Sequence, residues 1–282
     1  MSPSSLLPSK PIKFADVLAS LIVISMVLFA LLPLYWVFIT AFKPLGEFQT
    51  YPPTFWPSTF TLENFNIALT TYEVGSSIGD SLIIVLGTFI LSMTVGIPAA
   101  YSLARFNTGG ETLSFNILSF RFMPPIVPLV AFYLIGSQTK LLDTYVFLIL
   151  VNSLPIIPFV IWIMKGFFEE IPREIEEAAE IDGTTWPQLM RYIILPLATP
   201  GLVATSLFAI VFTWNELLFG VALTGRNIEP ITKNIPGILI GTNESHWGAL
   251  AATSLMMIVP VIFLSFFLQK YIVRGLTYGA VK

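Results

Sequence analysis

Cysteine is absent from this chain of 282 residues, and histidine occurs once, as His246. Without cysteine the chain has neither a disulfide framework nor a thiolate metal site, and a single histidine excludes a multi-histidine metal cluster. Charge is scarce as well, with 11% charged residues and a formal net charge of −3. Because no basic patch is available to follow a phosphate backbone, nucleic acid is not an expected partner.

The nucleotide-binding motif G-x-x-x-x-G-K-[ST] is missing too. The chain therefore cannot cradle nucleotide phosphates in the P-loop manner, and any ATP is handled by another subunit. The apolar runs contain no paired carboxylates, no Ser/His pair and no set of metal ligands, so an intramembrane enzyme is the least favoured class. We expect a protein that is not an enzyme and that binds no cofactor and no metal itself.

Apolar residues are what the chain has in abundance, at 55% of the sequence with a mean hydropathy of +0.81. They form six runs, each long enough to cross a hydrocarbon layer of about 30 Å. The first run is too long for a cleaved leader and has no small-residue cleavage pattern after it, so we interpret it as the first span. We expect an all-α integral membrane protein of one domain, 1–282, with spans at about 16–40, 78–105, 112–137, 141–168, 197–224 and 246–273.

The distribution of basic residues indicates which side faces the cytoplasm. Six spans place both termini on one side, and ten of the 14 Lys and Arg residues then lie on that side or at its edge. Cytoplasmic segments carry the excess of Lys and Arg, so both termini and the loop at 169–196 are expected inside. The outer side holds the loops 43–75 and 226–246. The four basic residues expected outside are Lys43, Lys140, Arg226 and Lys233.

The inner loop contains the longest strongly charged interval between the apolar spans. Pro172 suits the first position of a helix, and Asp182-Gly183 supplies its stop, with Gly183 free to adopt a positive φ. A second helical run is expected over 186–195. The first turns of the first helix are acidic, as the positive end of the helix dipole favours: Glu174, Glu176 and Glu177.

The same helix has a small apolar face. Ile175, Ala178 and Ala179 recur at the i, i+3, i+4 spacing, so we expect them to share one face while the glutamates point away. A small-faced acidic helix between two spans is suited to being gripped by a protein outside the membrane. The alternative is an interfacial helix without a partner, but such a helix favours Lys and Arg on its polar face.

These residues resemble a known family. Glu177-Ala178-Ala179, Asp182-Gly183, Ile193, Leu195-Pro196 and Pro200 match the cytoplasmic EAA loop of permease subunits of ATP-binding-cassette importers. The resemblance spans essentially the whole chain. It implies the six-transmembrane-helix type I importer permease fold, with 169–196 as the coupling loop that docks in a cleft of an ATPase dimer. ATP and Mg would be bound by those partner subunits.

The resemblance also implies roles for single residues of the coupling loop. Glu177 would face a basic residue of the ATPase, although Glu176 or Glu180 could make the same ion pair. Ala178, Ala179 and Gly183 would allow close approach of the partner. The ATPase-coupling residues implied in this way are Glu177, Ala178, Ala179, Asp182, Gly183, Ile193 and Pro196.

The carboxyl end, 269–282, resembles the tail of the sugar-importing branch, the maltose-type permeases, which reaches toward the ATPase dimer. Gly275 and Gly279 permit a turned tail that lies close to a partner. A frayed terminus is the alternative. The tail residues expected to contact the ATPase are Gly275, Gly279, Ala280 and Lys282.

Polar residues inside two spans are candidates for the solute path. The first group is Trp214-Asn215-Glu216, where a carboxylate inside an apolar span needs a cavity, a partner or outer water. The second is Asn152-Ser153, before Pro155 and Pro158, which we expect to interrupt the fourth span. For both groups two interpretations stay open: contact with the solute, or a structural polar clamp. We expect Arg121 to extend to the inner surface.

Together these features predict one permease subunit that imports a di- or oligosaccharide or glycoside by alternating access. The implied partners are a second permease, the ATPase dimer, an extracytoplasmic solute-binding protein and the lipid of a bacterial or archaeal cytoplasmic membrane. We expect the second permease to be similar but non-identical, with a homodimer as the alternative. Within the family, the alternatives are permeases for a polyol, a glycerophosphate or a polyamine. Outside it, the alternative is a self-sufficient secondary transporter, which would transport without any ATPase.

Overall fold

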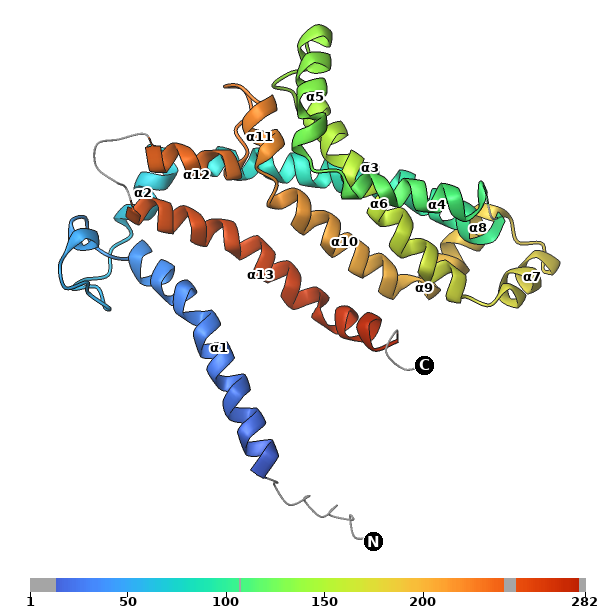
Figure 1. The fold of residues 1–282 in the computed structure, drawn as a ribbon, viewed down its shortest axis with the longest axis horizontal. Helices are drawn as coiled ribbons and strands as arrows, with labels where there is room; N and C mark the ends of the chain where they lie inside the picture. The colour runs from blue at the N-terminus through green and yellow to red at the C-terminus, as the bar shows by residue number, and fades with distance from the viewer. Residues whose placement is uncertain (1–13, 107, 241–246, 279–282) are drawn as a thin grey trace.

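In the computed structural model, which describes residues 14–106, 108–240 and 247–278, every regular element is helical. Two long helices, α3 (Val74–Phe106) and α6 (Tyr145–Glu170), pack along each other and form the centre of the molecule (Figure 1). Their contact is very close, because a Cβ added to Gly96 of α3 would lie 2.6 Å from Val160 of α6. Small residues at such positions let helix backbones approach each other.

Three further long helices pack in series beside this pair. α10 (Thr199–Trp214) packs on α3, α6 and α13 (Trp247–Tyr278), and α13 packs in turn on α1 (Phe14–Ala41). Figure 1 shows α1 running away from the other helices, in contact with α13 near one end. In the most apolar stretch of α1, none of the residues is buried within the chain. This helix therefore presents its apolar surface to lipid or to another subunit.

By length and composition, α1, α3, α6 and α13 can each cross a membrane. Two pairs of consecutive segments, each joined at a sharp bend, are also long and apolar enough to cross a membrane if each pair is taken as one span. They are Gly110–Phe122 with Ile126–Thr139, bent by 87°, and Trp186–Leu197 with Thr199–Trp214, bent by 81°. The chain is thus an all-helical membrane protein with four to six candidate spans. The first bend lies at Met123-Pro124-Pro125, where two N–H donors are missing.

The fifth predicted span, 197–224, is wrong as a single helix. α10 ends at Trp214, and a break leads into the short α11 (Leu218–Leu223). The expected interruption of the fourth span is also wrong, because α6 continues through both Pro155 and Pro158. Close packing against α3 holds α6 in place where the prolines remove hydrogen bonds.

The remaining elements are short and connect the long helices. The bounds of these elements are η1 (Glu47–Gln49), α2 (Glu63–Thr70), α4 (Gly110–Ser119), η2 (Phe120–Phe122), α5 (Ile126–Thr139), α7 (Arg173–Ile181), α8 (Trp186–Leu189), the π-helical η3 (Met190–Ile194), α9 (Leu195–Leu197) and α12 (Ile231–Ile240).

The loop after α1 is folded against that helix. Lys43 is buried, donates to the Thr54 carbonyl and lies over the Trp36 ring at 4.7 Å. Asn64, in α2, donates to the carbonyls of Ala41 and Lys43 at 3.0 and 2.7 Å.

At the end of α3 and α6 away from α7, two carboxylates hold the loop 225–230. Asp143, between α5 and α6, accepts from the N–H groups of Asn227 and Ile228 at 2.9 and 3.1 Å. Asp80 of α3 accepts from the N–H of Glu229 at 2.8 Å and from the Tyr145 hydroxyl at 2.7 Å.

The backbone hydrogen bonds set the protonation of Asp143. Burial raises the pKa of its carboxyl, but the N–H groups of the loop outweigh burial, and the pKa lies below its ordinary value. A depressed folded-state pKa means that this stabilisation is present above the ordinary pKa of about 4 and is lost as the pH falls through the folded-state pKa.

We expect Asp143→Asn to lower the apparent unfolding temperature of the purified protein in detergent at neutral pH. Losing one charge-assisted hydrogen bond costs about 1.5 kcal/mol. The difference from wild type should shrink as the pH falls below about 4. Thermal denaturation across a pH series measures it, with the exposed Asp182→Asn as control, and a difference independent of pH would contradict the assignment.

Candidate functional site: an acidic helix and a cavity between helices

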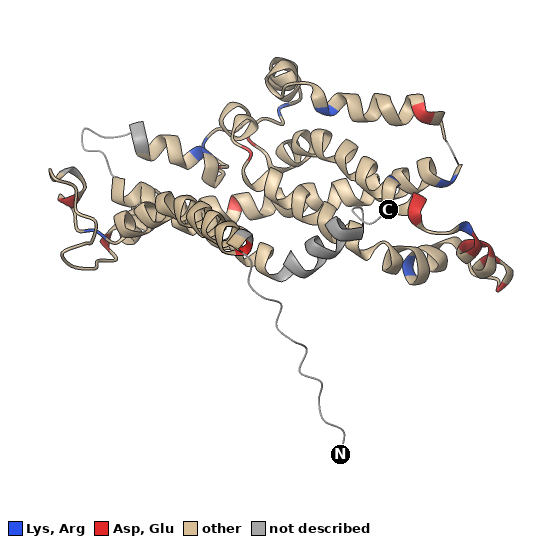
Figure 2. Cartoon of the chain, turned by 60° about the horizontal axis from the view of Figure 1, so that its bottom comes forward, with Lys and Arg blue, Asp and Glu red and all other residues tan. Residues whose placement is uncertain are grey.

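The acidic helix α7 lies at one extreme end of the molecule, where acidic residues gather in Figure 2. It begins at Arg173, and Pro172 is its N-cap with an extended ψ of 135° rather than its first helical residue. Gly183 has a φ of +78°, and the N–H groups of Gly183 and Thr184 donate to Glu180 and Ala179 at 3.0 Å. The expected stop at Asp182-Gly183 is therefore confirmed.

The two faces of α7 differ from the expected division. Ala179 and Glu176 are buried, whereas Ile175, Glu177 and Ala178 are exposed. The prediction that the glutamates point away from the packed face is wrong for Glu176. The exposed coupling candidates are Glu177, Ala178, Asp182, Gly183 and Pro196.

Glu176 is buried because α3 supplies its partners. One carboxylate oxygen accepts from Arg105 at 2.6 Å, and the other accepts from the Tyr101 hydroxyl at 2.7 Å. Arg105 also donates to the Ile171 carbonyl at 2.9 Å, and Arg173 donates to the Arg105 carbonyl at 3.1 Å. Both carboxylate oxygens of Glu176 therefore have partners within the chain, and Glu176 is not available to pair with another protein.

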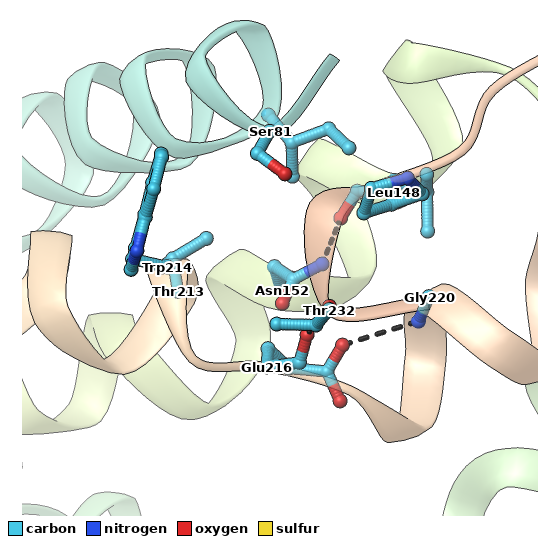
Figure 3. A pocket seen from close by; sticks show the side chains of 10 residues that line it. Ser81, Leu148, Asn152, Thr213, Trp214, Glu216, Gly220 and Thr232 are labelled. Atoms are coloured by element: carbon cyan, nitrogen blue, oxygen red, sulfur yellow. Dashed lines mark hydrogen bonds between the residues drawn. The ribbon is translucent and has the colours of Figure 1, made fainter. Parts of the chain in front are cut away.

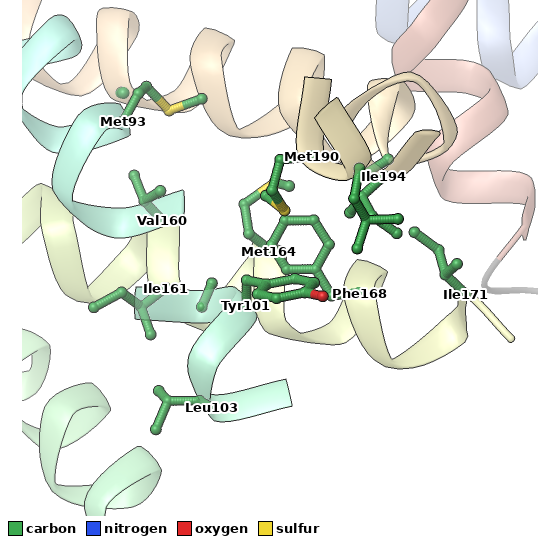
Figure 4. Close-up of a cluster of buried hydrophobic side chains, with 14 of the residues drawn as sticks. Met93, Tyr101, Leu103, Val160, Ile161, Met164, Phe168, Ile171, Met190 and Ile194 are labelled. Carbon is green, nitrogen blue, oxygen red and sulfur yellow. The ribbon is translucent and has the colours of Figure 1, made fainter. Parts of the chain in front are cut away.

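α7 and the segment 186–197 form a hairpin, and a cluster of buried apolar side chains joins this hairpin to the central helices α3 and α6 (Figure 4). Leu189, Met190 and Ile194 of the second helical run pack with Met164 and Phe168 of α6. Ile193 is half-buried against the same cluster. The segment 186–197 is thus attached to α3 and α6 by its apolar side chains.

A cavity of about 770 Å³ lies between the α4–α5 bend, α6, and the α10–α11 break. Its wall is largely apolar and contains one guanidinium and one carboxylate, those of Arg121 and Glu216. Arg121 lies over the rings of Phe159 and Phe212, at 4.5 and 4.7 Å, and donates to the Pro155 carbonyl at 3.1 Å. The expectation that Arg121 extends to the inner surface is wrong, because these contacts hold it in the cavity wall.

The residues predicted for a solute path separate into two groups. Asn152 and Glu216 line the cavity, and Glu216 accepts from the N–H groups of Phe219 and Gly220 at 2.8 and 3.2 Å, which caps α11. Ser153 donates to the Ile149 carbonyl at 2.6 Å, and Asn215 donates to the Val211 carbonyl at 2.8 Å; neither is among the cavity-lining residues.

Trp214 is the last residue of α10 and is not among the residues that line the large cavity. Its indole N–H donates to the Met257 carbonyl at 3.1 Å, so it joins α10 to α13. Figure 3 shows Trp214 with Asn152 and Glu216 around a second pocket, of about 10 Å³, which has room for about one water molecule. Trp214 thus makes a structural contact between helices, which agrees with the interpretation of this group as a polar clamp.

Sequence reasoning missed Arg121, Thr213 and Phe212 as cavity residues. The signal available was the position of Arg121 immediately before the Met-Pro-Pro bend, which turns it toward α6. Of the predicted tail, Gly275 lies in α13, which runs to Tyr278. Gly279, Ala280, Lys282 and also His246 lie outside the described residues.

Long apolar helices, a cavity between them and an exposed acidic hairpin at one end define a helical membrane transport protein. The chain belongs to the family of binding-protein-dependent transport system inner membrane components, whose model matches residues 92–278. It is a permease, not an enzyme. In the described residues, no group of three His, Cys, Asp or Glu side chains is arranged to hold a metal ion.

Curated relatives agree with the resemblance found in the sequence. The diacetylchitobiose uptake permease DasC of Streptomyces coelicolor is 33% identical over 254 residues, which are 89% of this chain and 91% of DasC. The trehalose transport permease SugB of Mycobacterium tuberculosis is 33% identical over 257 residues, covering 90% and 93%. The predicted similarity to permeases of the carbohydrate-uptake branch is confirmed.

Solved structures show the same fold. A chain from a bacterial ABC transporter that imports the acidic polysaccharide alginate aligns with a TM-score of 0.80 and 20% identity, over 94% of this chain and 99% of that one. A chain of the MetNI methionine ABC transporter aligns with a TM-score of 0.57 and 19% identity, over 73% and 97%.

Proposed function

We propose that this chain is one of two permease subunits of a type I ATP-binding-cassette importer for a di- or oligosaccharide or glycoside. The observation that carries the proposal is the exposed face of α7, with Glu177, Ala178 and Gly183 open to a partner. No atom lies within 4 Å of a Cβ built on Gly183. A partner protein can therefore approach the backbone of the turn closely.

The partner at α7 is an ATPase dimer, which binds ATP and Mg and supplies the energy. Because an exposed ion pair contributes little by itself, docking depends on the shape of the hairpin together with Glu177. Closure of the ATPase dimer displaces α7, and the segment 186–197 carries the motion to the central helices. The tail residues Gly275, Gly279, Ala280 and Lys282 are assigned to the same partner.

The solute passes at the cavity beside α6 and α10. A volume of about 770 Å³ lies within the range of about 300–1,000 Å³ for small-molecule sites. Phe212 and Phe219 offer aromatic faces, and Arg121 and Asn152 offer hydrogen-bonding groups for sugar hydroxyls. The named solutes of the relatives, among them diacetylchitobiose and trehalose, support a carbohydrate.

The remaining partners complete the pathway. The exposed apolar surfaces of α1 and α5 face lipid and a second permease, which is similar but not identical. An extracytoplasmic solute-binding protein delivers the sugar to the loops 43–75 and 226–246. The chain spans a bacterial or archaeal cytoplasmic membrane, with six spans if each bent pair is one span and with both termini inside.

Replacing Glu177 by Lys together with Gly183 by Val should abolish docking, because the pair reverses a charge and fills the open turn. We expect solute-stimulated ATPase activity of the assembled transporter to fall about tenfold or more, a typical size for coupling between two sites. Glu111→Lys, which makes the same charge change at an exposed site outside α7, should leave it intact. Unchanged activity in the α7 variant would contradict the proposal.

Single cysteines test the orientation, because the natural chain contains none. Glu177→Cys should react with a membrane-impermeant maleimide only in inside-out vesicles. Glu229→Cys, in the loop held by Asp80, should react in intact cells. Labelling of both residues from the same side would contradict the six-span topology.

Arg121→Gln tests the cavity. The variant removes a cation that contacts two aromatic rings, each such contact being worth about 0.5–2 kcal/mol, and it removes donors from the cavity wall. We expect solute uptake to fall while the ATPase subunits still co-purify. Lys140→Gln, which removes an exposed positive charge between α5 and α6, is the control, and equal uptake by both variants would place the solute path elsewhere.

A further inference from the structure

We propose that Arg105 and Glu176 form a latch that fastens α7 to α3, so that α3 moves with α7 as one body during transport. This inference rests on the proposed coupling role of α7. It makes Arg105, Glu176 and Tyr101 positioning residues, which act without touching the solute or the ATPase.

Apart from this contact, α7 packs Ala179 into the buried apolar cluster of α3, α6 and η3, and its other attachments are to its neighbours in sequence. It follows α6 through Ile171 and Pro172, and it leads into α8 through the turn at Gly183. α3 ends 67 residues before α7 begins, at Phe106 and Arg173. The hydrogen bonds of the latch are the direct polar link between these two distant segments.

The side chains of the latch are buried, and they are hydrogen-bonded within the chain. The side chains of Arg105 and Glu176 are 6% and 11% exposed. Both oxygens of Glu176 accept a hydrogen bond, and Arg105 has a second acceptor in the Ile171 carbonyl. Buried charges persist where the geometry is good and further hydrogen bonds satisfy them, and removing one partner leaves an uncompensated charge. Such a contact resists separation of α7 from α3 when α7 is displaced.

A charged pair within α6 lacks these properties. Lys165 and Glu169 lie one turn apart on the same helix, and their side chains are 26% and 48% exposed. An exposed i, i+4 pair contributes little and links no second element. It therefore serves as the matched control for the latch.

α3 can carry the motion to the opposite end of the chain. Its 33 residues make a rod of about 50 Å. At the end away from the latch, Asp80 and Ser81 of α3 accept from the N–H groups of Glu229 and Ile231, both at 2.8 Å. The latch thus connects α7, through one helix, with the loop that we assign to the solute-binding protein.

The test uses the complete transporter, with the second permease, the ATPase and the binding protein, reconstituted in proteoliposomes. Arg105→Ala and Glu176→Ala should each lower the number of solute molecules imported per ATP hydrolysed by about tenfold, while the ATPase still co-purifies. The exchange Arg105→Glu with Glu176→Arg should recover part of the loss. Lys165→Ala, which breaks the exposed pair of α6 outside the coupling loop, should match wild type.

A covalent substitute separates a mechanical role from a folding defect. The double variant Arg105→Cys with Glu176→Cys should lose coupling, and a short bifunctional methanethiosulfonate linker should restore it until a reductant is added. This chain has no other thiol to react with the linker. Restored coupling supports the latch, because α7 and α3 are then joined without the ion pair.

Two results would overturn the inference: single variants that import as much solute per ATP as wild type, or a linked double variant that stays inactive although its ATPase co-purifies. Failure of the proposed function looks different. In that case, the wild-type chain itself would neither retain the ATPase nor import solute when ATP is supplied.

Discussion

The close contact between α3 and α6 is the constraint on which the rest of the structure depends. Gly87 and Gly96 leave room for Ile149 and Val160 of α6, so the two backbones approach closely and the prolines of α6 do not break it. Each end of this pair then carries a polar attachment. Arg105 holds α7 at one end, and Asp80 holds the loop 225–230 at the other.

Polar groups inside the molecule are mostly satisfied within it, which limits what the chain offers to a solute. Glu216 caps α11, Trp214 binds α13, and Ser153 bonds within its own helix. In a membrane such pairing is required, because no water is available to replace it. The guanidinium of Arg121 lies over two rings in the cavity wall and donates to the Pro155 carbonyl, but a guanidinium has five N–H donors.

Sequence reasoning succeeded where the signal is local and failed where it depends on distant partners. The stop at Gly183 and the helical run from Trp186 both follow from residues next to one another. Glu176 looked like one more exposed glutamate, because its partner Arg105 is 71 residues away in the sequence. The break after Trp214 was missed because the residues that follow it, 217–223, are apolar enough to continue the span.

By itself, the sequence determined the class of this protein, since six apolar runs, scarce charge and the EAA spacing are properties of composition and order. It also excluded nucleotide binding in the P-loop manner by this chain, because the motif is absent. Only the tertiary structure decided which glutamate of α7 is buried and which candidates share a cavity. Those outcomes depend on which helices pack together, and packing joins side chains that no spacing rule connects.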